Sequence, residues 1–259
     1  NVSGNKQFYS NMRYRDSKIS YSIESICNEK KKEDVLSTFS ILSSKTVLTF
    51  YESTNNPEIR ILCSQVAPEP EEEGHFVAGE GGPSEVISLG SFHVIFSGKV
   101  SLFRTDKCDT PQIALHEILH ALGYDHNLDE KSIMYPVTSC DQQLDDYIAE
   151  DINRLYRIES KSDLLIENAS ASKIGRYIDF RITIINSGFQ DVANATLILR
   201  SGGDKIGEFN LGEIDIGTRR VLTAENVRAS RTVDSLEFTV VSNSEESSLE
   251  NNKAVIGVA

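Results

Sequence analysis

Three of the chain's five histidines fall within eleven residues of one short segment, HEILHALGYDHN (residues 116–127). His116 and His120 are four residues apart, so on a helix both imidazoles leave the same face, one turn apart. Both ring nitrogens could then reach one metal ion at about 2.0–2.1 Å. Glu117 points roughly 100° around the helix. It would therefore lie beside the ion, where it can take a proton from a metal-bound water.

A glycine and a third histidine extend this pattern. A left-handed residue at Gly123 would end the helix and turn the chain back sharply, which brings His126 to the other two histidines. Three histidine ligands leave the fourth tetrahedral position open for water, which is typical of a catalytic zinc site. The alternative is three solvated histidines on an ordinary capped helix. It leaves the glycine and the third spacing unexplained.

The elements that must position this segment alternate along residues 1–159. The histidine helix is predicted to begin with Thr110 as its N-cap and Pro111 at its first position. Apolar periodicity predicts the remaining elements. These are strands at 19–26, 46–52, 58–64, 91–96 and 99–104, the last two joined by a Ser97-Gly98 turn, and helices at 31–44 and 144–158. We therefore expect an α+β or α/β domain with a mixed, twisted sheet.

The composition changes near residue 160. Residues 160–259 contain no His, Cys, Met or Pro. Short alternating segments separated by Gly, Asn, Asp and Ser are typical of an antiparallel β-sandwich. They lie at 177–184, 193–199, 206–211, 219–223, 235–242 and 253–258. The sequence thus predicts two domains, 1–159 and 160–259.

Charge and hydropathy exclude several classes of partner. The formal net charge of the chain is −13 and that of residues 1–159 is −10, which argues against sequence-independent binding of nucleic acid and against adsorption to anionic lipid. No apolar run approaches the roughly 20 residues of a membrane span. We expect neither a signal peptide nor an anchor in this chain, because it has no basic-then-apolar leader.

The histidine segment resembles the metzincin zinc-peptidase signature H-E-x-x-H-x-x-G-x-x-H. SIMYP (132–136) resembles the Met-turn of that clan, with Met134 beneath the zinc. The sheet strands and the helix at 144–158 resemble those of prokaryotic matrixin-like members, so the likeness covers about residues 13–158. Asn127 departs from the Asp that many matrixins and adamalysins have after the third histidine. The resemblance implies a zincin-type fold and a peptidase.

The expected function is that of a zinc endopeptidase. One catalytic Zn²⁺ held by three histidines would activate a water, with Glu117 as the general base. A protein or peptide substrate would lie extended along a strand edge near residues 86–104. The resemblance also implies that residues 136–141 wall the pocket for the side chain after the scissile bond. The rival function is a non-catalytic, zinc-binding adhesion or scaffold protein of the cell surface; the intact Glu117 speaks against it. His75 and His93 are expected to be ordinary surface or strand residues.

A second metal ion is not favoured. Matrixin relatives bind structural calcium, but the acidic run Glu71–Glu73 lacks a spaced pattern of oxygen ligands. We expect this run to be a solvated loop.

Residues 160–259 resemble the immunoglobulin-like CARDB domains attached to exported prokaryotic proteins. FRITIINSGFQDVANATLILRSGG and LENNKAV carry this likeness. Such domains bind ligands or act as spacers, so a surface or matrix ligand is expected for residues 160–259 and catalytic activity is not.

The cysteines and sequons favour an extracellular or cell-surface protein. The cysteine count is even, no C-x-x-C pair occurs, and three sequons are present; four free thiols in a reducing compartment are the alternative. Of three connectivities we favour Cys27–Cys63 and Cys108–Cys140. The first would tie two strands of one sheet, and the second would close a loop around the zinc segment and the Met-turn.

Overall fold

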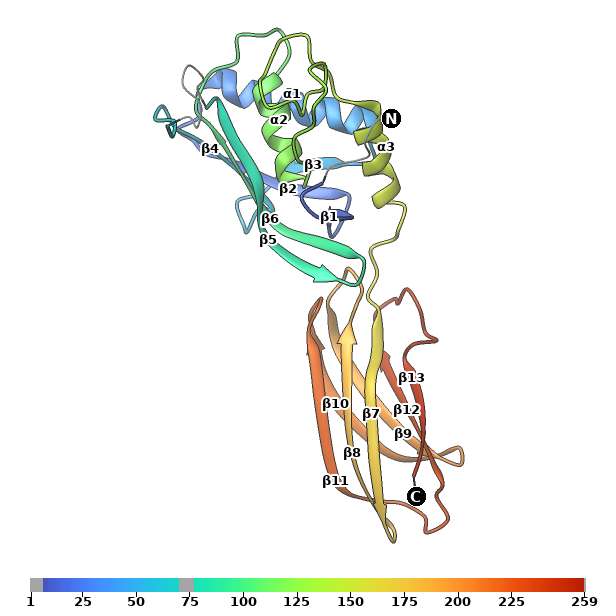
Figure 1. Ribbon diagram of the computed structural model, residues 1–259. Helices are drawn as coiled ribbons and strands as arrows, with labels where there is room; N and C mark the ends of the chain where they lie inside the picture. The colour runs from blue at the N-terminus through green and yellow to red at the C-terminus, as the bar shows by residue number, and fades with distance from the viewer. Residues whose placement is uncertain (1–6, 70–76, 259) are drawn as a thin grey trace. The chain divides into compact units, whose positions relative to one another are not determined.

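The computed structural model describes residues 7–69 and 77–258. The chain divides into two compact units, Asn1–Ile158 and Glu159–Ala259, whose elements are labelled in Figure 1. Two features predicted from the sequence, the acidic run Glu71–Glu73 and His75, lie outside the described residues. Within the described residues, no helix combines the length and apolar character that crossing a membrane requires.

The first unit contains one mixed sheet of six strands, as expected from the sequence. The order is β1-β6-β4-β2-β3, and β5 pairs with β6 on its other side. All pairs are parallel except β5–β6. The strands are β1 (Met12–Tyr14), β2 (Lys18–Ile23), β3 (Thr49–Glu52), β4 (Ile59–Cys63), β5 (Gly79–Leu89) and β6 (Phe92–Leu102). The antiparallel β5 is therefore an edge strand.

The predicted hairpin around Ser97-Gly98 is wrong. Residues 92–102 form one continuous strand, β6, and the turn that precedes it contains Gly90 at φ 58. Gly98 lies inside the sheet at a position where a side chain would not fit. A Cβ there would lie 2.5 Å from the Tyr14 hydroxyl and 3.3 Å from the Ala121 side chain. Gly98 thus lets the sheet approach the histidine helix, and no turn is needed to explain it.

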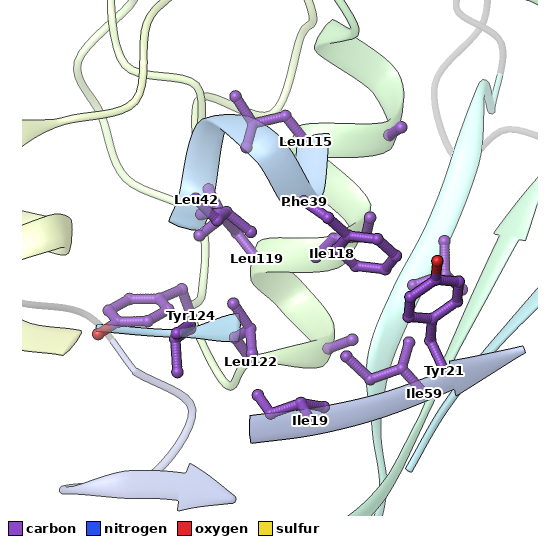
Figure 2. Close-up of a cluster of buried hydrophobic side chains, with 14 of the residues drawn as sticks. Ile19, Tyr21, Phe39, Leu42, Ile59, Leu115, Ile118, Leu119, Leu122 and Tyr124 are labelled. Carbon is purple, nitrogen blue, oxygen red and sulfur yellow. The ribbon is translucent and has the colours of Figure 1, made fainter. Parts of the chain in front are cut away.

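Three helices pack with this sheet: α1 (Glu29–Lys45), α2 (Gln112–Ala121) and α3 (Asp146–Leu155). The side chain of Asn28 caps α1 by accepting a hydrogen bond from Lys31 N. Figure 2 shows Phe39 and Leu42 of α1 meeting Ile118 and Leu119 of α2 above the sheet. The apolar spacing that predicted helices at 31–44 and 144–158 marks their buried faces. The buried apolar residues are Val35, Phe39 and Leu42 of α1, Ile148, Ile152 and Leu155 of α3, and Leu144 just before α3.

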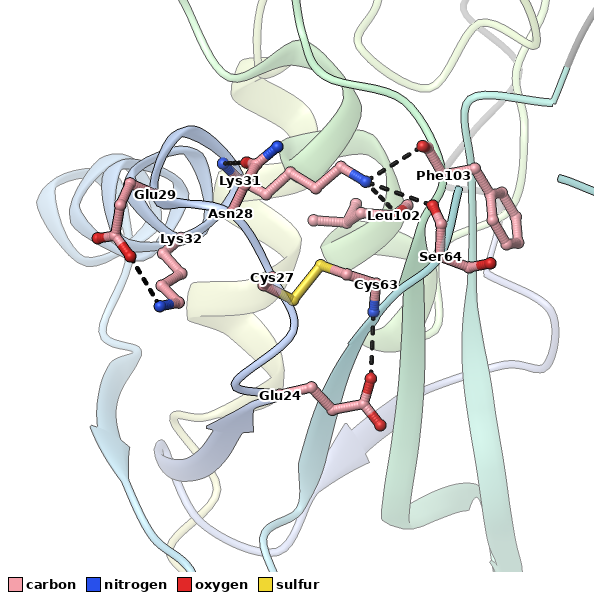
Figure 3. The surroundings of a disulfide bond; sticks show 10 residues. All are labelled: Glu24, Cys27, Asn28, Glu29, Lys31, Lys32, Cys63, Ser64, Leu102 and Phe103. Atoms are coloured by element: carbon pink, nitrogen blue, oxygen red, sulfur yellow. Dashed lines mark hydrogen bonds and ion pairs between the residues drawn. A yellow bond between two sulfur atoms is a disulfide. The ribbon is translucent and has the colours of Figure 1, made fainter. Parts of the chain in front are cut away.

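The buried Lys31 holds the chain that leaves β6 toward α2. Its side-chain nitrogen donates to the carbonyl oxygens of Leu102 at 2.8 Å and Phe103 at 3.1 Å, as Figure 3 shows. Burial lowers the pKa of Lys31, yet the two carbonyl groups face the ammonium directly. This contact fixes where the loop toward the histidine helix begins.

Two disulfides close the first unit, Cys27–Cys63 and Cys108–Cys140. These are the pairs favoured from the sequence. Cys63 ends β4, but Cys27 lies in the turn between β2 and α1 (Figure 3), so the first bond ties a strand to a turn and not to a second strand. The second bond spans 32 residues that include α2.

We expect mass spectrometry of the non-reduced protein to find no free thiol. The Cys108–Cys140 bond restricts the unfolded chain by about 3–4 kcal/mol on the loop-entropy model. A Cys108→Ser, Cys140→Ser double variant should therefore unfold at a lower temperature than the parent. Four alkylatable thiols in the untreated parent would contradict both the pairing and an exported protein.

The second unit is a β-sandwich. One sheet has the order β10-β9-β12-β13 and the other β11-β8-β7, and every pair is antiparallel. One core cluster takes side chains from both sheets, so the two sheets face each other. The strands are β7 (Leu164–Ile174), β8 (Tyr177–Asn186), β9 (Val192–Ser201), β10 (Asp204–Ile214), β11 (Arg219–Arg228), β12 (Ser235–Ser242) and β13 (Lys253–Gly257).

Candidate metal centre and active site

Helix α2 carries the first two histidines and Glu117. The predicted N-cap, Thr110, is wrong: the helix begins at Gln112 with Pro111 as N-cap and no side-chain cap on that residue. Asp106 takes the capping role from the preceding loop, since its carboxylate accepts from Ile113 N at 2.9 Å. A negative charge at a helix N-terminus also suits the helix dipole.

The three histidines of the motif converge on one point. The Nε2 atoms of His116 and His120 are 3.0 Å apart, and each lies 3.1 Å from Nε2 of His126. Nitrogens bound to one zinc ion in tetrahedral geometry lie about 3.3 Å apart, which is close to these separations. Within the described part of the chain, no other group of His, Cys, Asp or Glu gathers in this way.

Hydrogen bonds fix which nitrogen of each helical histidine is free. His116 Nδ1 lies 2.6 Å from the carbonyl oxygen of Ile133, and His120 Nδ1 lies 2.7 Å from that of Tyr124. A carbonyl oxygen only accepts, so each Nδ1 carries the hydrogen and each Nε2 presents a lone pair. Burial, followed by the neighbouring His120, lowers the pKa of His116 to about 3, and burial lowers that of His120 to about 4. Neutral rings with converging lone pairs fit a cation.

Gly123 brings the third histidine into this group. Its φ is +96°, which favours glycine, and a Cβ there would lie 2.8 Å from Met12 Cβ. Its N–H donates to His120 O at 2.9 Å, and the next residue, Tyr124, donates to Leu119 O at 3.0 Å. The helix ends here as the sequence predicts, and the chain returns to place His126.

The segment after His126 is held by the turn that contains Met134. Met134 is fully buried, its carbonyl oxygen accepts from Asn127 N at 2.9 Å, and its N–H donates to Ser132 Oγ at 3.0 Å. The Asn127 amide group donates to Ser132 Oγ as well. Because Ile133 of the same turn accepts from His116, this turn holds both His116 and the segment that follows His126.

Glu117 lies on the side of α2 that faces β5 and is 7% exposed. Burial, followed by the charge of Glu80, raises its pKa to about 8. A Cβ on Gly79 of β5 would touch the Glu117 carboxylate, which locates this carboxylate between the helix and the edge strand. Glu117 is therefore not a member of the histidine cluster.

The comparison with known families decides the assignment of the first unit. The sequence profile of the matrixin peptidases matches residues 11–157, which is more than half of the chain. The chain belongs to the matrixin family. It is therefore a metallopeptidase by family, and zinc is the metal that the family and the three-histidine cluster together indicate. No curated protein matches the sequence.

Solved structures of two kinds are similar to parts of this matrixin. A hatching enzyme zinc-protease from the medaka Oryzias latipes, high choriolytic enzyme 1, is 15% identical and covers 56% of this chain and 92% of its own, with a TM-score of 0.39. The CARDB domain of the PF1109 protein from Pyrococcus furiosus, in complex with di-metal ions, is 16% identical. It covers 38% of this chain and 88% of its own, with a TM-score of 0.33.

A Met134→Leu variant of this matrixin should keep its zinc and most of its activity. Leucine has a similar volume, so we expect a loss of stability below about 1.5 kcal/mol. Thermal unfolding and metal analysis check this. Complete loss of zinc would instead mean that the sulfur is a ligand.

Sequence reasoning missed several contacts of the site. The carbonyl groups of Tyr124 and Ile133 orient two histidines, but backbone groups leave no signal in a sequence. The ring of Phe8 stacks on His120 with centroids 5.7 Å apart, a contact between distant segments. Gly79 was also missed, although the run GEGG (79–82) could have drawn attention. His93 lies apart from the cluster, stacked on Tyr9, as an ordinary strand residue does.

Proposed function

We propose that the matrixin domain is a zinc endopeptidase in which His116, His120 and His126 are the metal ligands and Glu117 is the general base. One observation carries this proposal: three Nε2 atoms lie within 3.1 Å of one another on the helix that also presents Glu117. A site that only bound metal would have no use for that carboxylate. Met134 and Gly123 support the site and take no part in the chemistry.

The metal site and Glu117 would have different roles in hydrolysis. Zinc, when bound, supplies a Lewis acid that acidifies water and polarises a carbonyl oxygen. Glu117 takes the proton from the attacking water and delivers it to the amine that leaves.

The substrate would lie along Val86–Leu89 of β5. The range expected from the sequence was residues 86–104, but β6 is paired on both sides, so within that range only Val86–Leu89 belong to an edge strand. An extended peptide can add main-chain hydrogen bonds to such an edge. The exposed segment from Pro136 to Asp141 would wall the pocket for the side chain after the scissile bond.

An unbiased peptide-library digest with zinc supplied tests this function. Cleavage at defined sites that a chelator abolishes and zinc restores would support the endopeptidase and report its preference. A parent protein that holds zinc and cleaves nothing would support the rival, a non-catalytic scaffold.

We further propose that residues 160–259 are an accessory domain of an extracellular or cell-surface protein, with a surface or matrix ligand. Two disulfides support an exported protein. The second unit has its own hydrophobic core, and residues 160–259 contain no His or Cys that could bind zinc.

A fragment of residues 1–159 should therefore keep zinc and cleave short peptides at a rate close to that of the whole chain. Metal analysis and a peptide assay check this. Loss of activity in a folded, zinc-loaded fragment would contradict the division of labour.

A further inference from the structure

The first residues of β5 come unusually close to Glu117. A Cβ built on Gly79 would lie 2.6 Å from Glu117 Cγ and 2.9 Å from its Oε1. A Cβ on Gly81 would lie 2.0 Å from the backbone carbonyl oxygen of the same residue. Ordinary contacts of a Cβ begin at 3.4 Å, so neither position has room for a side chain. Both glycines thus face the one residue that the proposed function uses as a base.

Neither partner can move away without disturbing its surroundings. Glu117 is only 7% exposed, so the surrounding atoms restrict any movement of its carboxylate. The strand is tied at its start, because Ala78 O accepts from both Phe103 N and Arg104 N at 3.0 Å. Gly79 itself pairs with Leu102 of β6. An added methyl group at position 79 would therefore act on the Glu117 side chain.

We propose that Gly79 is a positioning residue: the absence of a side chain there lets the Glu117 carboxylate reach the attacking water. Gly81 sets how closely the edge strand approaches α2. The role of Gly79 in catalysis rests on the proposed function. The close contact between Gly79 and Glu117 does not depend on that function. Gly79 makes no contact with the reaction and acts only through the carboxylate.

The neighbouring Gly82 offers a matched control. A Cβ there meets nothing within 4 Å, and neither Gly79 nor Gly82 has a positive φ. Alanine is therefore allowed by the backbone at both positions, and both variants change the same strand by one methyl group. A difference between them reports the contact with Glu117.

In the zinc-loaded full chain, Gly79→Ala should lower kcat by roughly 10–100-fold, because a misplacement of about 1 Å of a catalytic group costs that much. KM should change less than twofold, zinc should stay at one ion per chain, and Gly82→Ala should match the parent. In a Glu117→Gln background, Gly79→Ala should cause no further loss. A rise in KM at unchanged kcat would show that the strand moved and would overturn the proposal.

Thermal unfolding tests the contact without any assay of activity. Gly79→Ala should unfold at a lower temperature than the parent, or fail to fold. Adding Glu117→Ala removes the side-chain atoms that the new methyl group would contact. The double variant should therefore fold and should unfold close to the temperature of the parent. If it does not, the proposal is overturned. If the rescue succeeds but the parent cleaves no peptide, only the proposed peptidase function fails.

Discussion

Glu117→Gln should strongly slow peptide hydrolysis while leaving the metal in place. Glutamine has nearly the same shape but cannot accept a proton near neutral pH. The loss of a positioned base should slow cleavage by about 10²–10⁴-fold or more. The three histidines are untouched, so metal analysis should still find close to one zinc per chain. The measurement is kcat on the best peptide of the library digest, with zinc content determined on the same sample.

Three other results for this variant would be informative. Cleavage by Glu117→Gln at the parent rate would remove Glu117 from the mechanism. Loss of zinc together with activity would mean that the carboxylate serves the metal, and the assignment of ligands would need revision. An unchanged unfolding temperature would show that the buried site tolerates the amide.

His120→Ala should lose zinc and activity together. The variant removes one of three Nε2 atoms that lie 3.0–3.1 Å apart, and two histidines provide too few ligands for a stable zinc site. We expect less than one tenth of the parent's zinc after dialysis, and no measurable cleavage. Because bound metal stabilises the folded state by mass action, zinc should raise the unfolding temperature of the parent and not that of the variant.

His93→Ala is the matched control for this prediction. His93 is the strand histidine that stacks on Tyr9 and lies outside the cluster, so its loss should change neither zinc content nor cleavage. Full zinc occupancy in His120→Ala would disprove the ligand set. Loss of zinc in His93→Ala would show that the metal lies elsewhere.

The sequence alone determined the local part of the site. The spacing of His116, His120 and Gly123 predicted a helix that presents two imidazoles and then turns back, because helical periodicity and the left-handed preference of glycine act over a few residues. Apolar spacing likewise predicted the buried face of α1, where Val35, Phe39 and Leu42 are all buried. The positions of β8–β13 in the second unit followed from alternation for the same reason, whereas β7 (Leu164–Ile174) was not predicted.

Tertiary structure decided everything that depends on segments far apart in the chain. Gly98 reads as a turn residue in sequence, yet it lies inside β6 because Tyr14 and Ala121 leave no room for a side chain. The run GEGG likewise does not reveal what Gly79 contacts, because this depends on how β5 lies against Glu117. The tautomers of His116 and His120 depend on the carbonyl groups of Ile133 and Tyr124. Such constraints arise from close packing and backbone hydrogen bonds, which depend on distances in space that residue identities do not encode one by one.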